Sequence, residues 1–199
     1  MNTAVNMTLD VYGSVSQSYL YKESDKYCMV FHDADKVHID IYDSNFKRVS
    51  TKTIEDELPK FGGFYSGSKY NFIVYGKSYG GESNRETYRV VKFDKEFNRL
   101  GSLSYNGDDT YTKIPSDACN SSFAENDGVL IYYTGRERLD GHQSNITLKI
   151  NIEEMTVADN YAGATSFPVN HASHQYRGIV KTDTNGYEVY SNLTDGIPC

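Results

Sequence analysis

The chain has 199 residues, a formal net charge of -7, and an aromatic content of 18 Tyr and 9 Phe with no Trp. A chain of this length can bury a core of its own, and Tyr and Phe favour half-buried strands over helices. The acidic charge and the lack of Lys and Arg clusters argue against duplex nucleic acid as the main partner, because phosphate binding draws its energy from such clusters. We therefore expect one all-β domain over residues 1–199.

The two longest apolar runs, residues 27–31 and 129–133, are far shorter than the ~20 residues of a membrane helix, so no membrane span is predicted. Residues 1–8 have neither the basic start nor the apolar block of a secretory signal, so this form is either cytoplasmic or cut from a longer precursor. The 3 Cys have no C-x-x-C spacing, which predicts neither a disulfide scaffold nor a zinc site built from Cys.

A hairpin motif repeats along the chain. Residues 41–49 (IYDSNFKRV) recur as residues 92–100 (KFDKEFNRL), about 50 residues later, with the shared pattern aromatic-Asp-x-x-Phe-x-Arg-aliphatic. Each copy joins two segments of alternating polarity, as a β-hairpin does, with the Asp accepting backbone hydrogen bonds and the Phe covering the turn. A weaker third copy lies at 148–157, where Asn151 replaces Asp and Met155 replaces Phe.

Two further strands precede each hairpin. Apolar strands are predicted at 27–31, 70–75 and 129–133, and strands rich in small residues at 61–65 and 117–123. Small residues suit strands crowded around the axis of a propeller. The predicted fold is an all-β, partial β-propeller of three to four antiparallel blades with a repeat of about 50 residues. We place the blades at 18–58, 61–110, 116–160 and, incomplete, 171–199.

The proposed blades do not close a ring. Either the chain is part of a longer propeller, or two copies associate as a homodimer, or its two ends complete one blade, because open strand edges invite aggregation. The one stretch with helical character, residues 53–58, is stopped by Pro59 and is expected to be a short connector.

Residues 61–199 resemble a family of uncharacterised propeller-like surface proteins of Gram-positive, often clostridial, bacteria. Residues 89–101 (RVVKFDKEFNRLG) are similar to that family's RVVKYDKNWNRLG hairpin, and residues 140–145 (DGHQSN) to its DGxNHQAN phrase. Residues 172–176 and 194–198 stand where the family has SHSFNQ and HGDAYPR, although the His of the latter is missing and Cys199 replaces its Arg. The resemblance implies a secreted or cell-surface propeller fragment and implies no reaction.

Candidate site residues gather in the second half of the chain, near strand starts and turns, which in a propeller lie at the faces around the axis. The candidate catalytic residues are Asp140, His142, His174 and Asp195. The candidate ligand-binding residues are Asp117, Asp140, His142, Gln143, Asn145, His174, Gln175 and Asp195. Two His and two carboxylates could hold a divalent metal or act as an acid/base pair.

A structural role for these residues is the stronger interpretation. A His beside Asn and Gln in a turn more often satisfies buried backbone groups. His171 and His174 would also point to opposite faces of a strand, which does not favour a shared ion. No metal and no cofactor are therefore predicted.

A set of tyrosines admits two interpretations, stacking on sugar rings or packing between blades, and packing is favoured because aromatic residues dominate β cores by area. The set is Tyr70, Tyr75, Tyr79, Tyr88, Tyr132 and Tyr133.

The leading functional hypothesis is a non-catalytic binding or scaffold module that recognises a glycan or a protein at the cell surface. The alternatives are a glycan hydrolase or lyase that uses the Asp/His cluster, and a self-assembling structural subunit. Convergence of the four candidate catalytic side chains within about 10 Å would discriminate the first two, because reacting groups must reach hydrogen-bond distance.

Overall fold

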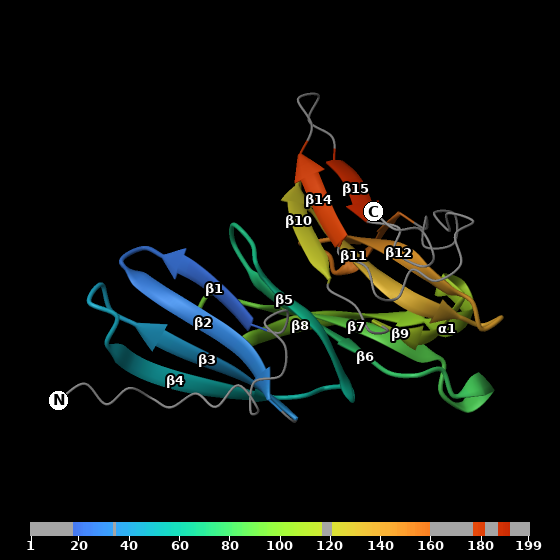
Figure 1. Ribbon diagram of the computed structural model, residues 1–199, viewed down its shortest axis with the longest axis horizontal. Coiled ribbons are helices and arrows are strands. Elements are labelled where there is room, and N and C mark those ends of the chain that lie inside the picture. Colours follow the sequence, from blue (N-terminus) through green and yellow to red (C-terminus); the bar gives the residue numbers. More distant parts are fainter. Residues whose placement is uncertain (1–17, 34, 117–120, 160–176, 182–186, 192–199) are drawn as a thin grey trace, which may run out of the picture. The chain divides into compact units, whose positions relative to one another are not determined.

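The computed structural model describes residues 18–33, 35–116, 121–159, 177–181 and 187–191, and these are almost entirely antiparallel β-structure (Figure 1). This confirms the predicted fold class. The chain divides into two compact units, Met1–Pro59 and Lys60–Cys199. Within the described ranges, no helix has the length and apolar character that a membrane crossing requires.

The first unit is a four-stranded antiparallel meander with the blade-like order β1-β2-β3-β4 (Figure 1). Its strands are β1 (Ser18–Glu23), β2 (Lys26–Asp33), β3 (Lys36–Tyr42) and β4 (Arg48–Glu55). Alternation along β2 and β3 directs one set of apolar side chains to a buried face, namely Cys28, Val30, Val37 and Ile39.

The helical character expected at 53–58 was wrong. Thr53 and Ile54 belong to β4, where they pair with His38 and Val37 of β3. Both residues are β-branched, and the available partner strand outweighs the weak local preference for a helical turn.

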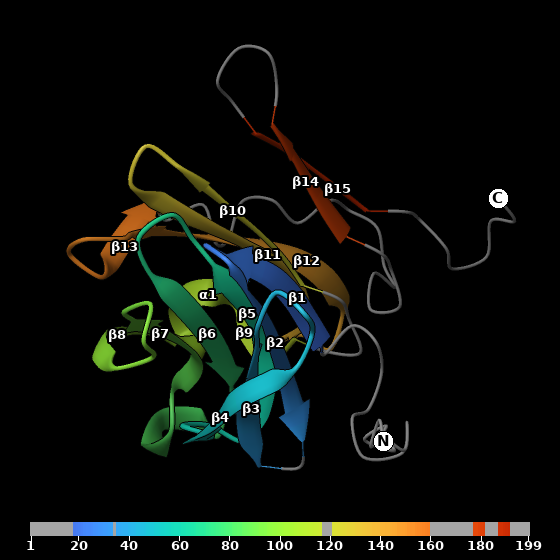
Figure 2. The same ribbon diagram turned by 90° about the vertical axis from the view of Figure 1, so that its left-hand side faces the viewer.

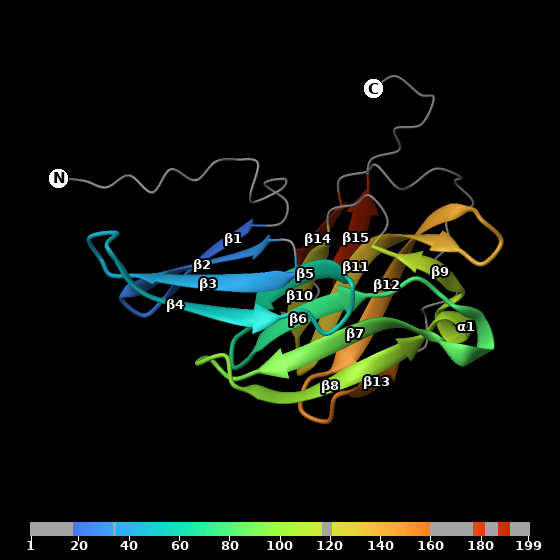
Figure 3. The same cartoon turned by 90° about the horizontal axis from the view of Figure 1, so that it is seen from below.

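The second unit holds a second four-stranded meander, with β5 (Lys60–Ser66), β6 (Asn71–Gly76), β7 (Glu86–Phe93) and β8 (Arg99–Asn106) in that order. A 3-10 turn, η2 (Gly81–Ser83), lies in the β6–β7 loop. The short helix α1 (Gly107–Thr110) follows β8 and leads into β9 (Figure 3).

The next sheet has the order β10-β11-β12-β13, and β9 pairs with the end of β11. These strands are β9 (Thr112–Pro115), β10 (Ser122–Asn126), β11 (Val129–Arg138), β12 (Gln143–Asn151) and β13 (Thr156–Asp159). A two-stranded hairpin of β14 (Arg177–Lys181) and β15 (Tyr187–Ser191) lies beside β10 (Figure 2).

One apolar core joins these two larger sheets of the second unit. Its buried members are Phe72, Val74, Tyr88, Val90, Tyr105, Leu130, Tyr132, Ile146, Leu148, Ile150 and Ile152. The Tyr132 hydroxyl crosses between the sheets and donates to the Gly62 carbonyl at 3.0 Å. A Cβ atom at position 62 would lie 2.9 Å from this hydroxyl, so the close approach requires glycine.

The packing interpretation of the tyrosines is confirmed for most of the set. Tyr75, Tyr88, Tyr132 and Tyr133 are buried, while Tyr70 and Tyr79 are half-buried.

The repeated motif forms the predicted hairpins, β3–β4 and β7–β8. The Asp43 carboxylate accepts hydrogen bonds from the backbone N–H of Asn45 at 2.9 Å and of Lys47 at 3.0 Å. Asp94 accepts the equivalent bond from Asn98 at 2.7 Å. The aspartates therefore hold both turns, as their side-chain chemistry predicts.

The Phe of each turn adopts a left-handed backbone, which the pattern did not predict. Phe46 has φ = 59° and Phe97 has φ = 61°, and Met155 of the third copy has φ = 52°. Glycine or asparagine normally occupies this position, because a Cβ atom makes the left-handed region costly.

Candidate functional site

The predicted site residues divide into two groups. Asp117, His174, Gln175 and Asp195 lie outside the described residues, as does His171. The others, Asp140, His142, Gln143 and Asn145, lie in the β11–β12 turn and at the start of β12. The candidate site is therefore built around this turn.

Backbone hydrogen bonds bring Asp140 and His142 together. The Arg138 N–H donates to the His142 carbonyl at 2.7 Å, and the Gly141 N–H donates to the Arg138 carbonyl at 3.0 Å. Gly141 has φ = 84°, a conformation that glycine adopts without strain. Within this tight turn Asp140 accepts the His142 N–H at 3.1 Å, and its carboxylate lies 3.5 Å from the imidazole Nδ1.

Gln143 and Asn145 follow this pair at the start of β12. They stand opposite Glu137 and Gly135 of β11, whereas Ser144 between them stands opposite Arg136. Successive strand residues point to opposite faces of the sheet. Gln143 and Asn145 therefore point to one face, and Arg136 and Ser144 point to the other.

Arg138 and Tyr111 complete the exposed cluster, and sequence reasoning missed both. Arg138 Nη2 forms an ion pair with Asp140 Oδ2 at 2.8 Å. Its guanidinium carbon lies 5.2 Å from the centre of the Tyr111 ring, within the range of a cation–π contact. Tyr111 follows α1 with φ = 52°, and 39% of its surface is exposed.

Arg136 lies buried next to this cluster, with only 1% of its surface exposed. Its Nε donates to Ser144 Oγ at 3.1 Å, and its Nη1 donates to the Thr110 carbonyl and, at 3.3 Å, to Thr112 Oγ1. These oxygens are all neutral, and burial lowers the pKa of the guanidinium. Arg136 therefore anchors the residue immediately before Tyr111.

A sequence signal for Arg136 was available. Leu130, Tyr132 and Thr134 alternate along β11 toward the core, and the same period reaches Arg136 two residues later. The alternation alone thus places a guanidinium in the interior.

The Asp140 carboxyl keeps a lowered pKa in this setting. Partial desolvation acts to raise that pKa, but the hydrogen bond from the His142 backbone and the charge of Arg138 together outweigh it. Asp140 is therefore an ionised hydrogen-bond acceptor near neutral pH rather than a proton donor.

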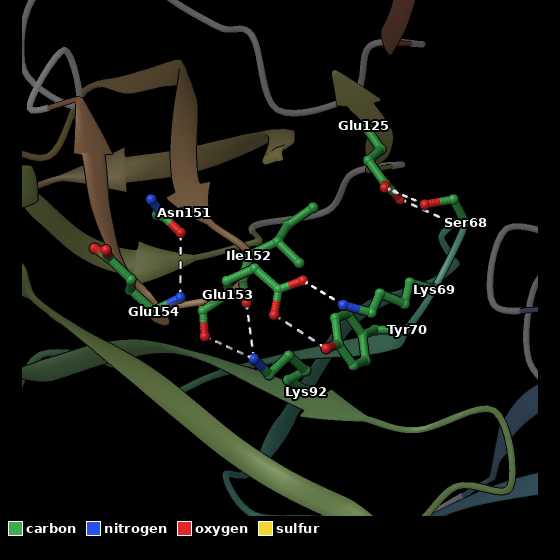
Figure 4. A network of polar contacts seen from close by, with 9 residues as sticks. All are labelled: Ser68, Lys69, Tyr70, Lys92, Glu125, Asn151, Ile152, Glu153 and Glu154. Atoms are coloured by element: carbon green, nitrogen blue, oxygen red, sulfur yellow. Dashed lines mark hydrogen bonds and ion pairs between the residues drawn. The ribbon is translucent and has the colours of Figure 1, made fainter. Parts of the chain in front are cut away.

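A second polar network, at the other end of the same unit, is structural (Figure 4). Lys92 donates to the carbonyls of Ile152 at 2.8 Å and Glu153 at 3.0 Å, and it lies 4.8 Å from the centre of the Tyr70 ring. Lys69 pairs with Glu153 at 2.8 Å. These contacts fasten the β5–β6 turn to the β12–β13 turn. Because Lys92 is buried and its contacts lie inside the protein, we assign this network no ligand.

Across the described part of the chain, no three His, Cys, Asp or Glu side chains are grouped so as to hold a metal ion.

Comparisons with known proteins show fold-level likeness only. No family model matches the chain, and no curated protein matches it. An α-L-arabinofuranosidase structure from Clostridium thermocellum aligns with a TM-score of 0.48 and 11% identity, over 86% of this chain and 59% of that one. A structure of an ACO/RPE65 chimera aligns with a TM-score of 0.42 and 10% identity, over 70% of this chain and 38% of that one.

This chain thus spans about two fifths to three fifths of the length of those two structures, whose covered shares are 38% and 59%. With TM-scores of 0.42 and 0.48, neither likeness carries a functional argument. Membership of the propeller-like surface family stays a prediction, and what is established is an all-β chain of blade-like antiparallel sheets.

Proposed function

We propose that the chain is a non-catalytic binding module that recognises a glycan at the cell surface through the β11–β12 turn. The observation that carries the proposal is the exposed cluster of Tyr111, Arg138, Asp140 and His142, which brings a ring, a cation, a carboxylate and an imidazole together. Sugar recognition needs an aromatic surface for the apolar face of the ring and charged groups for its hydroxyls, because hydrogen bonds to charged groups are the stronger ones.

The cluster is also pre-organised. Arg136 fixes Thr110 next to Tyr111, and the tight turn at Gly141 fixes Asp140 against His142. A surface that is already ordered loses less conformational entropy when it binds, which favours recognition of a flexible oligosaccharide.

The charge state of Asp140 does not suit one of the two roles that a glycosidase needs. A glycosidase needs one carboxylic acid with a raised pKa to protonate the leaving oxygen. The pKa of Asp140 is lowered, since its hydrogen bond to His142 and the charge of Arg138 outweigh desolvation. Asp140 suits a hydrogen-bond acceptor for a sugar hydroxyl and does not suit a general acid.

Affinity electrophoresis of the chain in gels that contain soluble xylan, β-glucan or polygalacturonate tests the proposal. Retardation by at least one polysaccharide is expected, and Tyr111→Asn should reduce it about tenfold in affinity, a loss of roughly 1.4 kcal/mol. Asparagine tolerates the left-handed backbone of position 111, so this variant removes the ring without adding strain.

Tyr19→Ala, on β1 in the other unit, is the matched control and should migrate like the wild type. Migration unaffected by every polysaccharide would overturn the proposal. Release of reducing sugar from a retarding polysaccharide would instead favour a hydrolase.

A further inference from the structure

An exposed phenylalanine in the first unit has an unfavourable backbone conformation that burial does not offset. Phe46 is left-handed, at φ = 59°, and 67% of its surface is exposed. A left-handed conformation costs a residue with a Cβ atom roughly 1–2 kcal/mol. Phe97 adopts the same conformation in the next copy but is only 5% exposed, and its ring stacks on Phe64 at 5.9 Å. Burial offsets the cost at Phe97 and not at Phe46.

The exposed Phe46 ring packs against a second aromatic ring. Phe46 stacks on Tyr27 with 4.7 Å between ring centres and 26° between ring planes. Lys22 Nζ lies 5.9 Å from the centre of the Tyr27 ring. One face of the Phe46 ring therefore rests on Tyr27, and the other is presented to solvent.

A polar group adjoins this aromatic pair on the same face of the sheet. Asp40 accepts hydrogen bonds from Thr51 Oγ1 at 2.6 Å, from Arg48 Nη1 at 3.3 Å and from the Tyr42 hydroxyl at 3.4 Å. Tyr42 stands opposite both Tyr27 and Arg48 in the strand register, which makes the aromatic pair and the polar group contiguous.

The repeat shows how this face differs from a packing face. Asp40 is itself buried, and the residue that corresponds to it in the second copy of the motif is the fully buried and apolar Val91. The residue that corresponds to Tyr42 is the buried Phe93. The first copy thus keeps the aromatic residue of the turn and replaces the apolar residues beside it with hydrogen-bonding ones.

We propose that this face of the β1–β4 sheet is a second carbohydrate-binding surface, on which a neutral pyranose ring stacks on Phe46 and hydrogen-bonds to the group around Asp40. A pyranose has an apolar C–H face and a rim of hydroxyls, which match a flat ring beside charged groups. An apolar protein partner fits less well, because it would desolvate the half-exposed guanidinium of Arg48, whose partner Asp40 is already buried, without replacing the guanidinium's contacts with water. The inference shares the ligand class of the proposed function but uses different residues in the other unit.

The absence of Trp from the sequence allows a direct test. Phe46→Trp retains an aromatic ring and introduces the sole indole of the protein. Titration with soluble xylan or β-glucan should shift its fluorescence emission saturably to shorter wavelength. Leu100→Trp, at the exposed start of β8, is the matched control and should not respond.

Phe46→Asn gives the loss of function, since asparagine tolerates the left-handed backbone. It should weaken retention on the same polysaccharide roughly five- to tenfold, the contribution expected of one aromatic contact. Because the variant relieves backbone strain, its thermal midpoint should not fall, and weaker binding will not reflect unfolding.

The outcomes separate the two proposals. A silent Phe46→Trp reporter, with retention that still depends on Tyr111, overturns the inference and leaves the proposed function intact. A responding reporter, with retention insensitive to Tyr111→Asn, supports the inference and overturns the proposed site. Emission that changes with protein concentration and not with polysaccharide identifies an interface between copies of the chain, and overturns the inference.

Discussion

The β3–β4 and β7–β8 hairpins share a turn and differ in what surrounds it. In both, an aspartate holds the backbone and a phenylalanine takes a left-handed conformation. Phe97 is buried beside Phe64 and Phe93, whereas Phe46 stacks on Tyr27 and stays mostly exposed. The motif therefore encodes the shape of the turn, and neighbouring positions decide whether the ring packs in the core or lies at the surface.

The largest expected difference is between the losses of unfolding free energy when each of these two rings is removed. Phe97→Ala should lower the free energy of unfolding by about 3–5 kcal/mol, because it removes a buried aromatic side chain and leaves a cavity. Phe46→Ala should change it by less than about 1 kcal/mol. Urea denaturation followed by circular dichroism measures both, and similar losses would show that the two rings are equally embedded.

Lys92 and Ile41 occupy the same position of the motif, and the next largest difference is expected between the stability costs of replacing each by Met. Lys92→Met should cost roughly 2–3 kcal/mol, because the carbonyls of Ile152 and Glu153 lose a charged donor. Ile41→Met should cost less than about 1.5 kcal/mol, as volume-conserving apolar exchanges do. Equal urea midpoints for the two variants would show that the hydrogen bonds from Lys92 in β7 to the β12–β13 turn do not stabilise the protein.

The two aspartates should behave alike. Asp43→Ala and Asp94→Ala should each lower the free energy of unfolding by about 1 kcal/mol, because each removes a side-chain acceptor of backbone N–H groups in the turn. Asp43→Asn and Asp94→Asn, which keep an acceptor oxygen, are the controls and should recover most of the loss. A clear difference between the two sites would mean that the turns are not equivalent.

The smallest effect concerns the dependence of stability on pH and the ion pair of Arg89 with Glu86. Burial acts to raise the pKa of Glu86, but hydrogen bonds from Arg89 and Ser104 and nearby positive charge outweigh it, so the pKa is lowered from 4.5. A carboxyl whose pKa is lowered by folding stabilises the fold above its unfolded pKa, and that contribution is lost as the pH falls through its folded pKa.

Glu86→Gln should therefore reduce stability at pH 7 and flatten the loss of stability that the wild type shows as the pH falls from about 4.5 through the lower folded pKa of Glu86. Unfolding midpoints between pH 7 and pH 3, for the variant and the wild type, test this. An unchanged acid slope would show that Arg89 does not hold the carboxylate.

The sequence predicted the sheets well because their signal is local. Alternating polarity and the aspartate turns placed the β3–β4 and β7–β8 hairpins, and the tyrosine-rich strands were correctly expected to pack. The helical character expected at 53–58 failed because a partner strand decided the outcome, and no local pattern marked the short helix α1.

The candidate site was found only in part, because its members come from distant segments. Asp140 and His142 are joined by one turn, so short-range spacing identified them. Tyr111 meets Arg138 only through the pairing of β9 with β11, which spacing does not encode. The left-handed backbone of Phe46 was likewise not predicted, because a phenylalanine in a turn indicates an apolar residue and gives no sign of a strained backbone.

Lys92 distinguishes the second copy of the repeat from the first. Its ammonium group fits the two carbonyls of the β12–β13 turn, and the isoleucine at the matching position of the first copy carries no donor for such carbonyls. A recombinant that swapped the first and second copies would keep both aspartate turns, yet would place an isoleucine where the carbonyls of Ile152 and Glu153 now find the Lys92 ammonium group.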